Sequence, residues 1–128
     1  MIALDTHVWV YLISDDKKQL SQNAIRKIDD ASNLAISAIS CWEAALLFKK
    51  GRLKVKLNFE RWIQNGLKYP KLKVVDPAPQ ILIKSVLLDG LHPDPADRII
   101  AATCLLNQLP LITKDQQLHK WNGIETIW

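Results

Sequence analysis

Four acidic residues are the strongest candidates for chemistry in this chain of 128 residues: Asp5, Glu43, Asp97 and Asp115. If they converge, each pair of carboxylates 4 Å apart repels by roughly 4 kcal/mol at an effective dielectric of 20. A bound divalent cation removes that penalty, and an all-carboxylate site favours hard ions such as Mg²⁺ or Mn²⁺. Such ions generate a nucleophile from water and neutralise a phosphodiester. The four acids therefore predict metal-assisted hydrolysis, provided that the fold brings them together.

Each acid also has a local explanation. Asp5 could cap a helix beginning at residue 6 or 7, and Asp115 could be a turn or cap residue. Glu43 lies among apolar helical neighbours without a Lys or Arg three or four residues away. Ser40 could form a capping box with Glu43, but that explanation fails if Ser37 is the cap.

The stretch from His92 to Leu106 contains two acids with different expected roles. Asp94 occupies the N-cap position of a predicted helix, and Pro95 suits its first turn. Asp97 follows three residues later, near the positive end of the helix dipole. The sequence leaves open whether Asp94 is a further ligand or only the cap.

Alternating strands and helices must position these acids. Apolar runs predict strands at residues 1–4, 34–36, 72–75, 109–113 and 124–128, and periodic patterns predict helices at 8–13, 21–30, 37 or 40 to 51, 59–67, 79–88 and 95–106. Residues 52–58 are expected to form a loop or a short helical turn. This order predicts one α/β domain over residues 1–128, a three-layer α/β/α sandwich with a mostly parallel sheet of four or five strands. Its ligand site would form at the carboxyl ends of the strands.

The positive charge of the chain is concentrated in one segment. Residues 1–48 carry four Lys or Arg against six Asp or Glu, residues 49–73 carry nine against one, and residues 74–128 carry four against six. The basic segment is either a solvated face or a contact surface for a polyanion. Its first members are the candidates for nucleic-acid binding: Lys49, Lys50, Arg52, Lys54 and Lys56.

Other classes of protein and site fit poorly. Cys41 and Cys104 lie in apolar helical patterns, as reduced thiols of a cytoplasmic protein do. The N-terminal run lacks the basic start of a secretion signal, and no apolar run is long enough to span a bilayer. With four glycines, the sequence has no Gly-rich phosphate loop.

Four segments in order resemble the PIN-domain ribonucleases, and among them the VapC-type toxins: LDTHVWVYLI, ISAISCWEAALLFKKGRL, HPDPADRIIAATCL and LPLITKDQQL. The resemblance implies a Mg²⁺- or Mn²⁺-dependent endoribonuclease that forms homodimers and is held inactive by a cognate antitoxin. The family's acidic quartet falls on Asp5, Glu43, Asp97 and Asp115. Thr6 and Thr113 fall beside these acids, where the family often has hydroxyl residues, and Arg98 is implied as a phosphate contact.

Two other functions remain as alternatives. An aspartyl-nucleophile phosphatase would use Asp5, but it needs a second Asp two residues later, where this chain has His7. A non-catalytic module could bind RNA or a protein through the basic segment.

Overall fold

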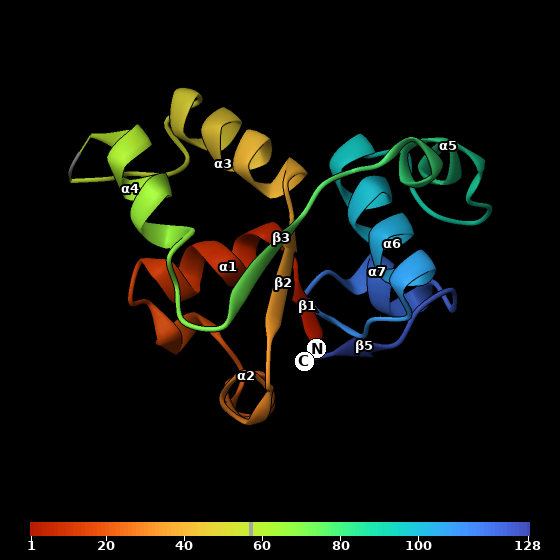
Figure 1. Cartoon of the computed structure of the whole chain (residues 1–128), viewed down its shortest axis with the longest axis horizontal. Helices are drawn as coiled ribbons and strands as arrows, with labels where there is room; N and C mark the ends of the chain where they lie inside the picture. The colour runs from red at the N-terminus through yellow and green to blue at the C-terminus, as the bar shows by residue number, and fades with distance from the viewer. Residues whose placement is uncertain (57) are drawn as a thin grey trace.

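Five parallel strands form the central sheet of the computed structural model, which describes residues 1–56 and 58–128. Their order across the sheet is β3-β2-β1-β4-β5. The strands are β1 (Ile2–Leu4), β2 (Leu34–Ser37), β3 (Leu72–Val75), β4 (Leu111–Ile112) and β5 (Thr126–Ile127). The predicted α/β class, with a parallel sheet between layers of helices, is confirmed (Figure 1).

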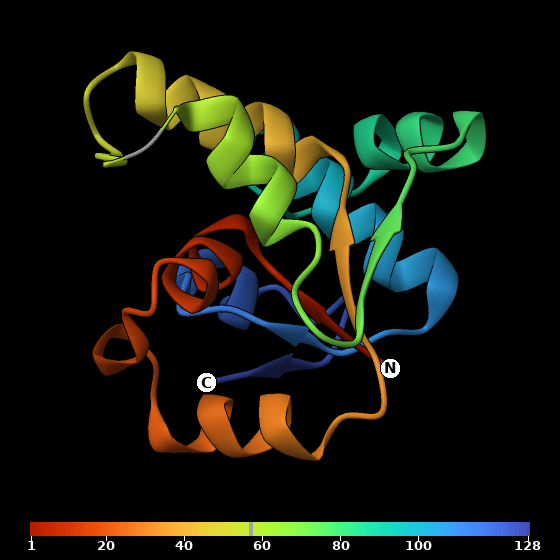
Figure 2. The same cartoon turned by 60° about the vertical axis from the view of Figure 1, so that its left-hand side comes forward.

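Helices cover both faces of the sheet. On one side lie α1 (Thr6–Ile13), α2 (Gln22–Asp30), α3 (Ile39–Lys49) and α4 (Phe59–Gly66), with a short 3₁₀ turn at Lys17–Gln19. On the other side lie α5 (Pro79–Leu87), α6 (Pro95–Asn107) and α7 (Gln116–Lys120). Figure 2 shows α3 and α4 together at one end of the molecule and α2 at the opposite end. Helix α3 contacts both α1 and α6, so it bridges the two layers at the end where the site forms.

Burial on both faces explains why the strands are apolar at consecutive positions. Ile2 and Leu4 of β1 pack into the core beneath α1 and α2, whereas Ala3 between them packs into the core beneath α5 and α6. The same division separates Leu111 from Ile112 in β4. Alternate residues of one strand thus supply both cores, as the two-residue period of a strand requires.

The strand order reverses beside β1. The chain adds β2 and β3 on one side of β1 and then returns to place β4 and β5 on its other side. Adjacent parallel strands whose connections leave in opposite directions create a crevice at their carboxyl ends. Asp5 follows β1 and Thr113 follows β4, so both residues stand at this crevice.

Several predicted boundaries differ from the observed ones. The predicted strand at residues 109–113 is a strand only at Leu111–Ile112, and the one at residues 124–128 only at Thr126–Ile127. Helix α7 was not predicted, because five residues are too few to show a helical period. In the predicted loop at 52–58, the described residues 52–56 and 58 lie outside helices and strands, and Leu57 lies outside the described residues.

The cysteines are free thiols, with Cys104 buried and Cys41 half-buried. This agrees with the prediction that they are packed thiols. Among the described residues, no helix combines the length and apolar character needed to cross a bilayer.

Candidate active site

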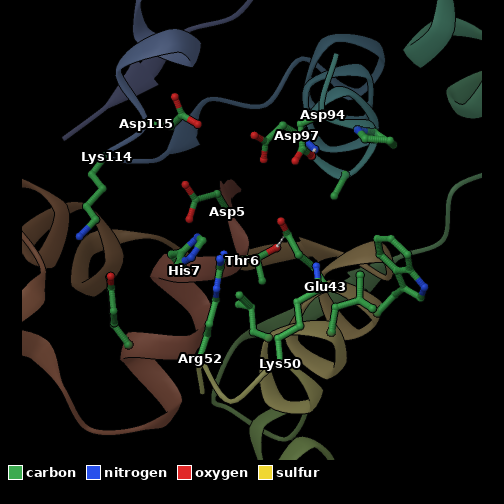
Figure 3. A pocket seen from close by; sticks show the side chains of 16 residues that line it. Asp5, Thr6, His7, Glu43, Lys50, Arg52, Asp94, Asp97, Lys114 and Asp115 are labelled. Atoms are coloured by element: carbon green, nitrogen blue, oxygen red, sulfur yellow. Dashed lines mark hydrogen bonds between the residues drawn. The ribbon is translucent and has the colours of Figure 1, made fainter. Parts of the chain in front are cut away.

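A cleft of about 710 Å³ opens at the carboxyl ends of β1 and β4. All four predicted acids line it, each from a different segment of the chain: Asp5, Glu43, Asp97 and Asp115 (Figure 3). Thr6, His7 and Asp94 also line it. The structure therefore brings together the acids that the sequence singled out.

Asp5 serves both as a helix cap and as a wall of the cleft. Its Oδ1 accepts a hydrogen bond of 2.9 Å from the Val8 amide, which caps α1. Its Oδ2 accepts a hydrogen bond from the hydroxyl of Thr113, at the end of the neighbouring strand. Only 7% of Asp5 is exposed. Asp5 can therefore cap α1 and line the cleft at the same time, because the cap uses only one of its two carboxylate oxygens.

Glu43 is held by a hydroxyl group instead of a capping box. Helix α3 begins at Ile39, so Ser40 lies inside its first turn and cannot be the cap. The N-cap residue is Ala38, so neither predicted serine occupies the cap position, although the Ser37 hydroxyl accepts from the Ile39 amide at 3.3 Å. Thr6 donates to Glu43 Oε1, and its hydroxyl lies 3.0 Å from Ser40 Oγ. The local explanation for Glu43 therefore fails, and its carboxylate faces the cleft.

The two acids at the start of α6 occupy different positions, and Asp94 is the predicted cap. Asp94 Oδ1 caps the helix by accepting from the Asp97 amide at 3.0 Å. Asp97 lies on the first turn with its side chain in the cleft (Figure 3). Asp94 nevertheless remains beside the site, since one oxygen each from Glu43, Asp94 and Asp97 lie within 4.8 Å of one another.

Asp115 caps the short helix α7, with Oδ1 accepting from the amides of Gln117 at 2.8 Å and Leu118 at 3.4 Å. The Asp115 amide donates to Thr113 Oγ1 at 3.0 Å. Because the same hydroxyl donates to Asp5, Thr113 connects the Asp5 carboxylate to the backbone of Asp115. Thr6 and Thr113 thus lie beside the acids, as the resemblance implied.

The cleft raises the pKa of three of its acids, Asp5, Glu43 and Asp97. Burial raises the pKa of Asp97 from 3.8 to about 7, with further contributions from Asp94, Glu43, Asp115 and Asp5. Burial also raises the pKa of Asp5 and of Glu43, although hydrogen bonds from Thr113 and Thr6 oppose these shifts. Carboxylates that resist ionisation in this way gain most from a cation among them.

The basic segment reaches the cleft through two of its members. Lys50 and Arg52 line the cleft, and Arg52 points into it (Figure 3). Lys49, Lys54 and Lys56 are exposed, and the described lining of the cleft does not include them. A third cation, Lys114, also lines the cleft, and its Nζ lies 5.1 Å from the ring centre of Tyr11, another lining residue.

Arg98 does not occupy the position that the resemblance implied. Its guanidinium donates to the carbonyls of five residues at the end of α5 and in the loop that follows: Ser85, Val86, Leu88, Leu91 and His92. These bonds turn it away from the acidic cleft, whose described lining does not include it. The prediction of a phosphate contact is therefore corrected, because the donors of Arg98 bind the backbone.

Sequence reasoning missed His92. Its Nε2 lies 3.3 Å from Asp97 Oδ2, and one ligand atom each from His92, Asp97 and Asp115 lie within 4.8 Å of one another. A single histidine in a loop carries no periodic signal. In the sequence, the one signal for His92 is its position two residues before Asp94, the N-cap residue of α6.

The donors of the cleft fit a hard divalent cation. Two described groups are close enough to share an ion: Glu43, Asp94 and Asp97 offer three carboxylate oxygens, and His92, Asp97 and Asp115 offer two oxygens and an imidazole nitrogen. Asp5 is not a member of these groups, but it lines the same cleft.

Comparison with known proteins agrees with this architecture. The chain is 33% identical to Ribonuclease VapC22 of Mycobacterium tuberculosis over 130 aligned positions, which cover 99% of this chain and 98% of the relative. Among solved structures, DNA-bound VapBC of Salmonella typhimurium has a TM-score of 0.70 at 21% identity, covering 99% of this chain and 98% of that one. VapBC2 of Rickettsia felis, bound to a DNA fragment of its promoter, has a TM-score of 0.69 at 19% identity with the same coverage.

These solved structures support the fold, and the relative extends the likeness to the sequence of the whole chain. A protein-family model for the PIN domain matches residues 2–123. The resemblance found in the four sequence segments is thereby confirmed, and the chain belongs to the PIN domain family.

Proposed function

We propose that this protein is a Mg²⁺- or Mn²⁺-dependent endoribonuclease and the toxin of a toxin–antitoxin pair. The observation that carries the proposal is the convergence of Asp5, Glu43, Asp97 and Asp115 on one cleft with Lys50 and Arg52 at its side. Oxygen donors suit a hard cation, and the cations beside them suit a phosphate backbone.

Residues of the chain hold the donors in place. Thr113 and the Val8 amide fix Asp5, and Thr6 fixes Glu43, so these carboxylates cannot turn freely away from one another. Asp97 and Asp115 are fixed through the first turns of α6 and α7. A divalent ion bound by these acids would activate water and neutralise charge on the phosphodiester. Lys50 and Arg52 would hold the RNA backbone beside it.

Neither alternative gains support from the contacts. An aspartyl-nucleophile phosphatase would need a second Asp two residues after Asp5, and the residue that lines the cleft at that position is His7. A module that only binds would not need several buried acids with raised pKa values, because these cost folding free energy without a cation.

The role as a toxin rests on the relatives. Ribonuclease VapC22 is named as a nuclease, and the Salmonella and Rickettsia structures are VapBC complexes. We propose by analogy that this chain binds RNA and a cognate antitoxin protein and forms a homodimer. Light scattering of the purified protein tests the dimer, for which the expected mass is twice that of the chain.

Cleavage of a single-stranded RNA in Mg²⁺ tests the enzyme. Asp97→Asn should reduce the rate by about a hundredfold or more while retaining the circular dichroism spectrum of the parent. Asp30→Asn changes an exposed acid at the end of α2 and is the matched control, which should cut at the parental rate. An Asp97→Asn protein that cuts RNA as fast as the parent would refute the site assignment.

The substrate can be identified in cells. Sequencing of RNA 5′ ends after brief induction should reveal cleavage positions with the wild type that are absent with Asp97→Asn. If both proteins gave the same ends, the proposed toxin activity would be wrong.

A further inference from the structure

His92 lies in the loop between α5 and α6, directly beside the cleft. Its side chain is 17% exposed, and its Nε2 lies 3.3 Å from Oδ2 of Asp97. This is a distance at which an imidazole N–H can bond a carboxylate. Nevertheless, Nε2 is buried and makes no hydrogen bond in the described part of the chain, because the orientation of the two groups is poor. A buried polar atom without a partner calls for an explanation.

The other ring nitrogen determines which tautomer is present. The amide of Asp94 donates to His92 Nδ1 at 3.3 Å, so Nδ1 must carry a lone pair. In a neutral ring the proton then resides on Nε2, the nitrogen that faces Asp97. The Nε2–H of His92 is thus placed within bonding distance of Asp97 Oδ2. For a hydrogen bond to form, only the relative orientation of the ring and the carboxylate has to change.

We propose that His92 is a positioning residue for the metal site: its Nε2–H donates to Oδ2 of Asp97 and leaves Oδ1 to bind the cation. The inference rests on the proposed function, since it assigns His92 a role in the same cleft. Groups that orient metal-binding side chains through hydrogen bonds affect metal affinity or activity by about ten- to hundredfold.

Direct ligation by His92 is the competing role, because His92, Asp97 and Asp115 each have a ligand atom within 4.8 Å of the others. A nitrogen that binds a metal carries no proton, so ligation through Nε2 would move the proton of a neutral ring to Nδ1. That proton would face the N–H of Asp94, and two donors would oppose each other. The contact with the Asp94 amide therefore favours positioning over ligation.

The backbone that carries His92 is fixed by Arg98. The Nη1 atom of Arg98 donates to the carbonyls of Leu91 at 2.7 Å and of His92 at 3.3 Å. Arg98 also follows Asp97 directly in α6. The same helical turn therefore carries the Asp97 carboxylate and the side chain that fixes the His92 backbone. The ring and the carboxylate thus have a common support, as a positioning contact requires.

Calorimetric titration of the full chain with Mn²⁺ tests the role without depending on RNA cleavage. His92→Leu, which removes the donor, should weaken Mn²⁺ binding by about ten- to hundredfold. His92→Gln, whose amide can donate from a similar place, should recover most of the affinity. Asp89→Asn, an exposed change in the same loop, should bind Mn²⁺ like the parent. Parental affinity in His92→Leu, or an equal loss in the Leu and Gln variants, would overturn the proposal.

Nuclear magnetic resonance of the ¹⁵N-labelled imidazole tests the wild-type protein directly, even if His92→Leu folds poorly. The His92 signals, assigned with His92→Gln, should show a proton on Nε2 both without metal and with saturating Mg²⁺. An Nε2 without a proton in the Mg²⁺ complex would identify a ligand and overturn positioning. If Asp97→Asn abolished cleavage while His92 failed these tests, only this inference would fall; parental cleavage by Asp97→Asn would instead refute the proposed function.

Discussion

Hydroxyl groups hold two of the carboxylates in the cleft, those of Asp5 and Glu43. Thr113 donates to Asp5 and accepts from the Asp115 amide, and Thr6 donates to Glu43. A hydroxyl can restrain a carboxylate without neutralising it, so the negative charge remains available to a ligand. This arrangement is compatible with the proposed metal site.

Replacement of Thr113 by valine tests this restraint, because the side chains are nearly equal in shape. Thr113→Val should lower Mn²⁺ affinity by about tenfold, since Asp5 and the Asp115 amide both lose a partner. Titration calorimetry measures the loss. Thr103→Val is the matched control, because within the described part of the chain that buried hydroxyl bonds the Ile99 carbonyl of its own helix and no group of the cleft. Equal affinities in the two variants would contradict the restraint.

The raised pKa of Asp97 predicts how stability depends on pH. Between 3.8, its ordinary value, and about 7, its value in the fold, the folded chain holds a proton that the unfolded chain releases. The free energy of unfolding without metal should therefore fall as the pH rises from about 4 to about 7. Mg²⁺ should reduce this fall, because it binds the ionised form. Urea unfolding at several pH values measures both effects.

Asp97→Asn removes that titration and should stabilise the metal-free protein above about pH 7. A tenfold change in a protonation equilibrium corresponds to about 1.4 kcal/mol. Because water in the cleft screens part of the repulsion, the expected gain is about 1 to 2 kcal/mol. The pH dependence should become shallower without vanishing, since Asp5 and Glu43 also have raised pKa values. An unchanged dependence would show that Asp97 titrates normally.

At the scale of single residues, the sequence predicted the acids of the cleft but not the contacts that His92 and Arg98 make beside them. Asp5 was predictable because it directly follows an apolar run, Asp115 because it comes shortly after another, and Asp97 because it lies in the first turn of a strongly marked helix. The position of His92 depends on how a loop folds back, and the donors of Arg98 bind carbonyls that any sequence would supply. Neither contact leaves a pattern in the order of side chains.

At the scale of elements, Arg98 joins α6 to the end of α5. Helix ends leave carbonyls without partners, and the Arg98 guanidinium bonds three near the end of α5 and two in the next loop. One side chain thus replaces the capping motif that α5 lacks and fixes the path of the chain toward His92.

Arg98→Met should therefore lower the free energy of unfolding by about 2 to 3 kcal/mol, because several half-buried carbonyls lose a charged donor. Chemical denaturation at neutral pH provides the measurement. Lys84→Met removes an exposed cation from α5 and should change stability little. If both variants had parental stability, the contacts of Arg98 would not support the junction.

The elements that sequence patterns missed are the short ones. Helix α7 has five residues, and its start depends on Asp115 accepting from two amides, a local geometry that a turn could share. Helices α2 and α6 were predictable because Ser21 and Asp94 stand at their caps before periodic apolar positions. A helix could be predicted from the sequence when it was both long enough to show a period and marked by an N-cap residue.

For the whole molecule, the uneven distribution of charge predicts salt-dependent RNA binding. Lys50 and Arg52 bring the basic segment to the acidic cleft. The double variant Lys50→Ala/Arg52→Ala should weaken binding of single-stranded RNA and reduce the slope of log affinity against log salt by about 1.4, or about 0.7 per lost contact. Fluorescence anisotropy over a range of salt concentrations measures the slope.

Lys68→Ala/Lys73→Ala removes the same charge from exposed positions of the same segment, and the described lining of the cleft includes neither residue. This control should retain most of the parental slope. If the two double variants behaved alike, the basic segment would act only through its net charge.

The parallel sheet was the most predictable property of the whole molecule, because apolar runs such as 34–36 and 72–75 alternate with capped helices. The order of the strands could not be predicted from the sequence, because it depends on the chain returning to the free edge of β1 to place β4. That return creates the crevice, so the location of the site follows from a feature beyond local patterns.

The hydrogen bond between Thr113 and Asp5 joins residues 108 positions apart. During synthesis Asp5 therefore leaves the ribosome well before Thr113 and Asp115. A growing chain has no complete cleft until these later residues have emerged. If the chain is a ribonuclease that threatens its own cell, this order of assembly keeps each molecule inert while the segment between them is being made.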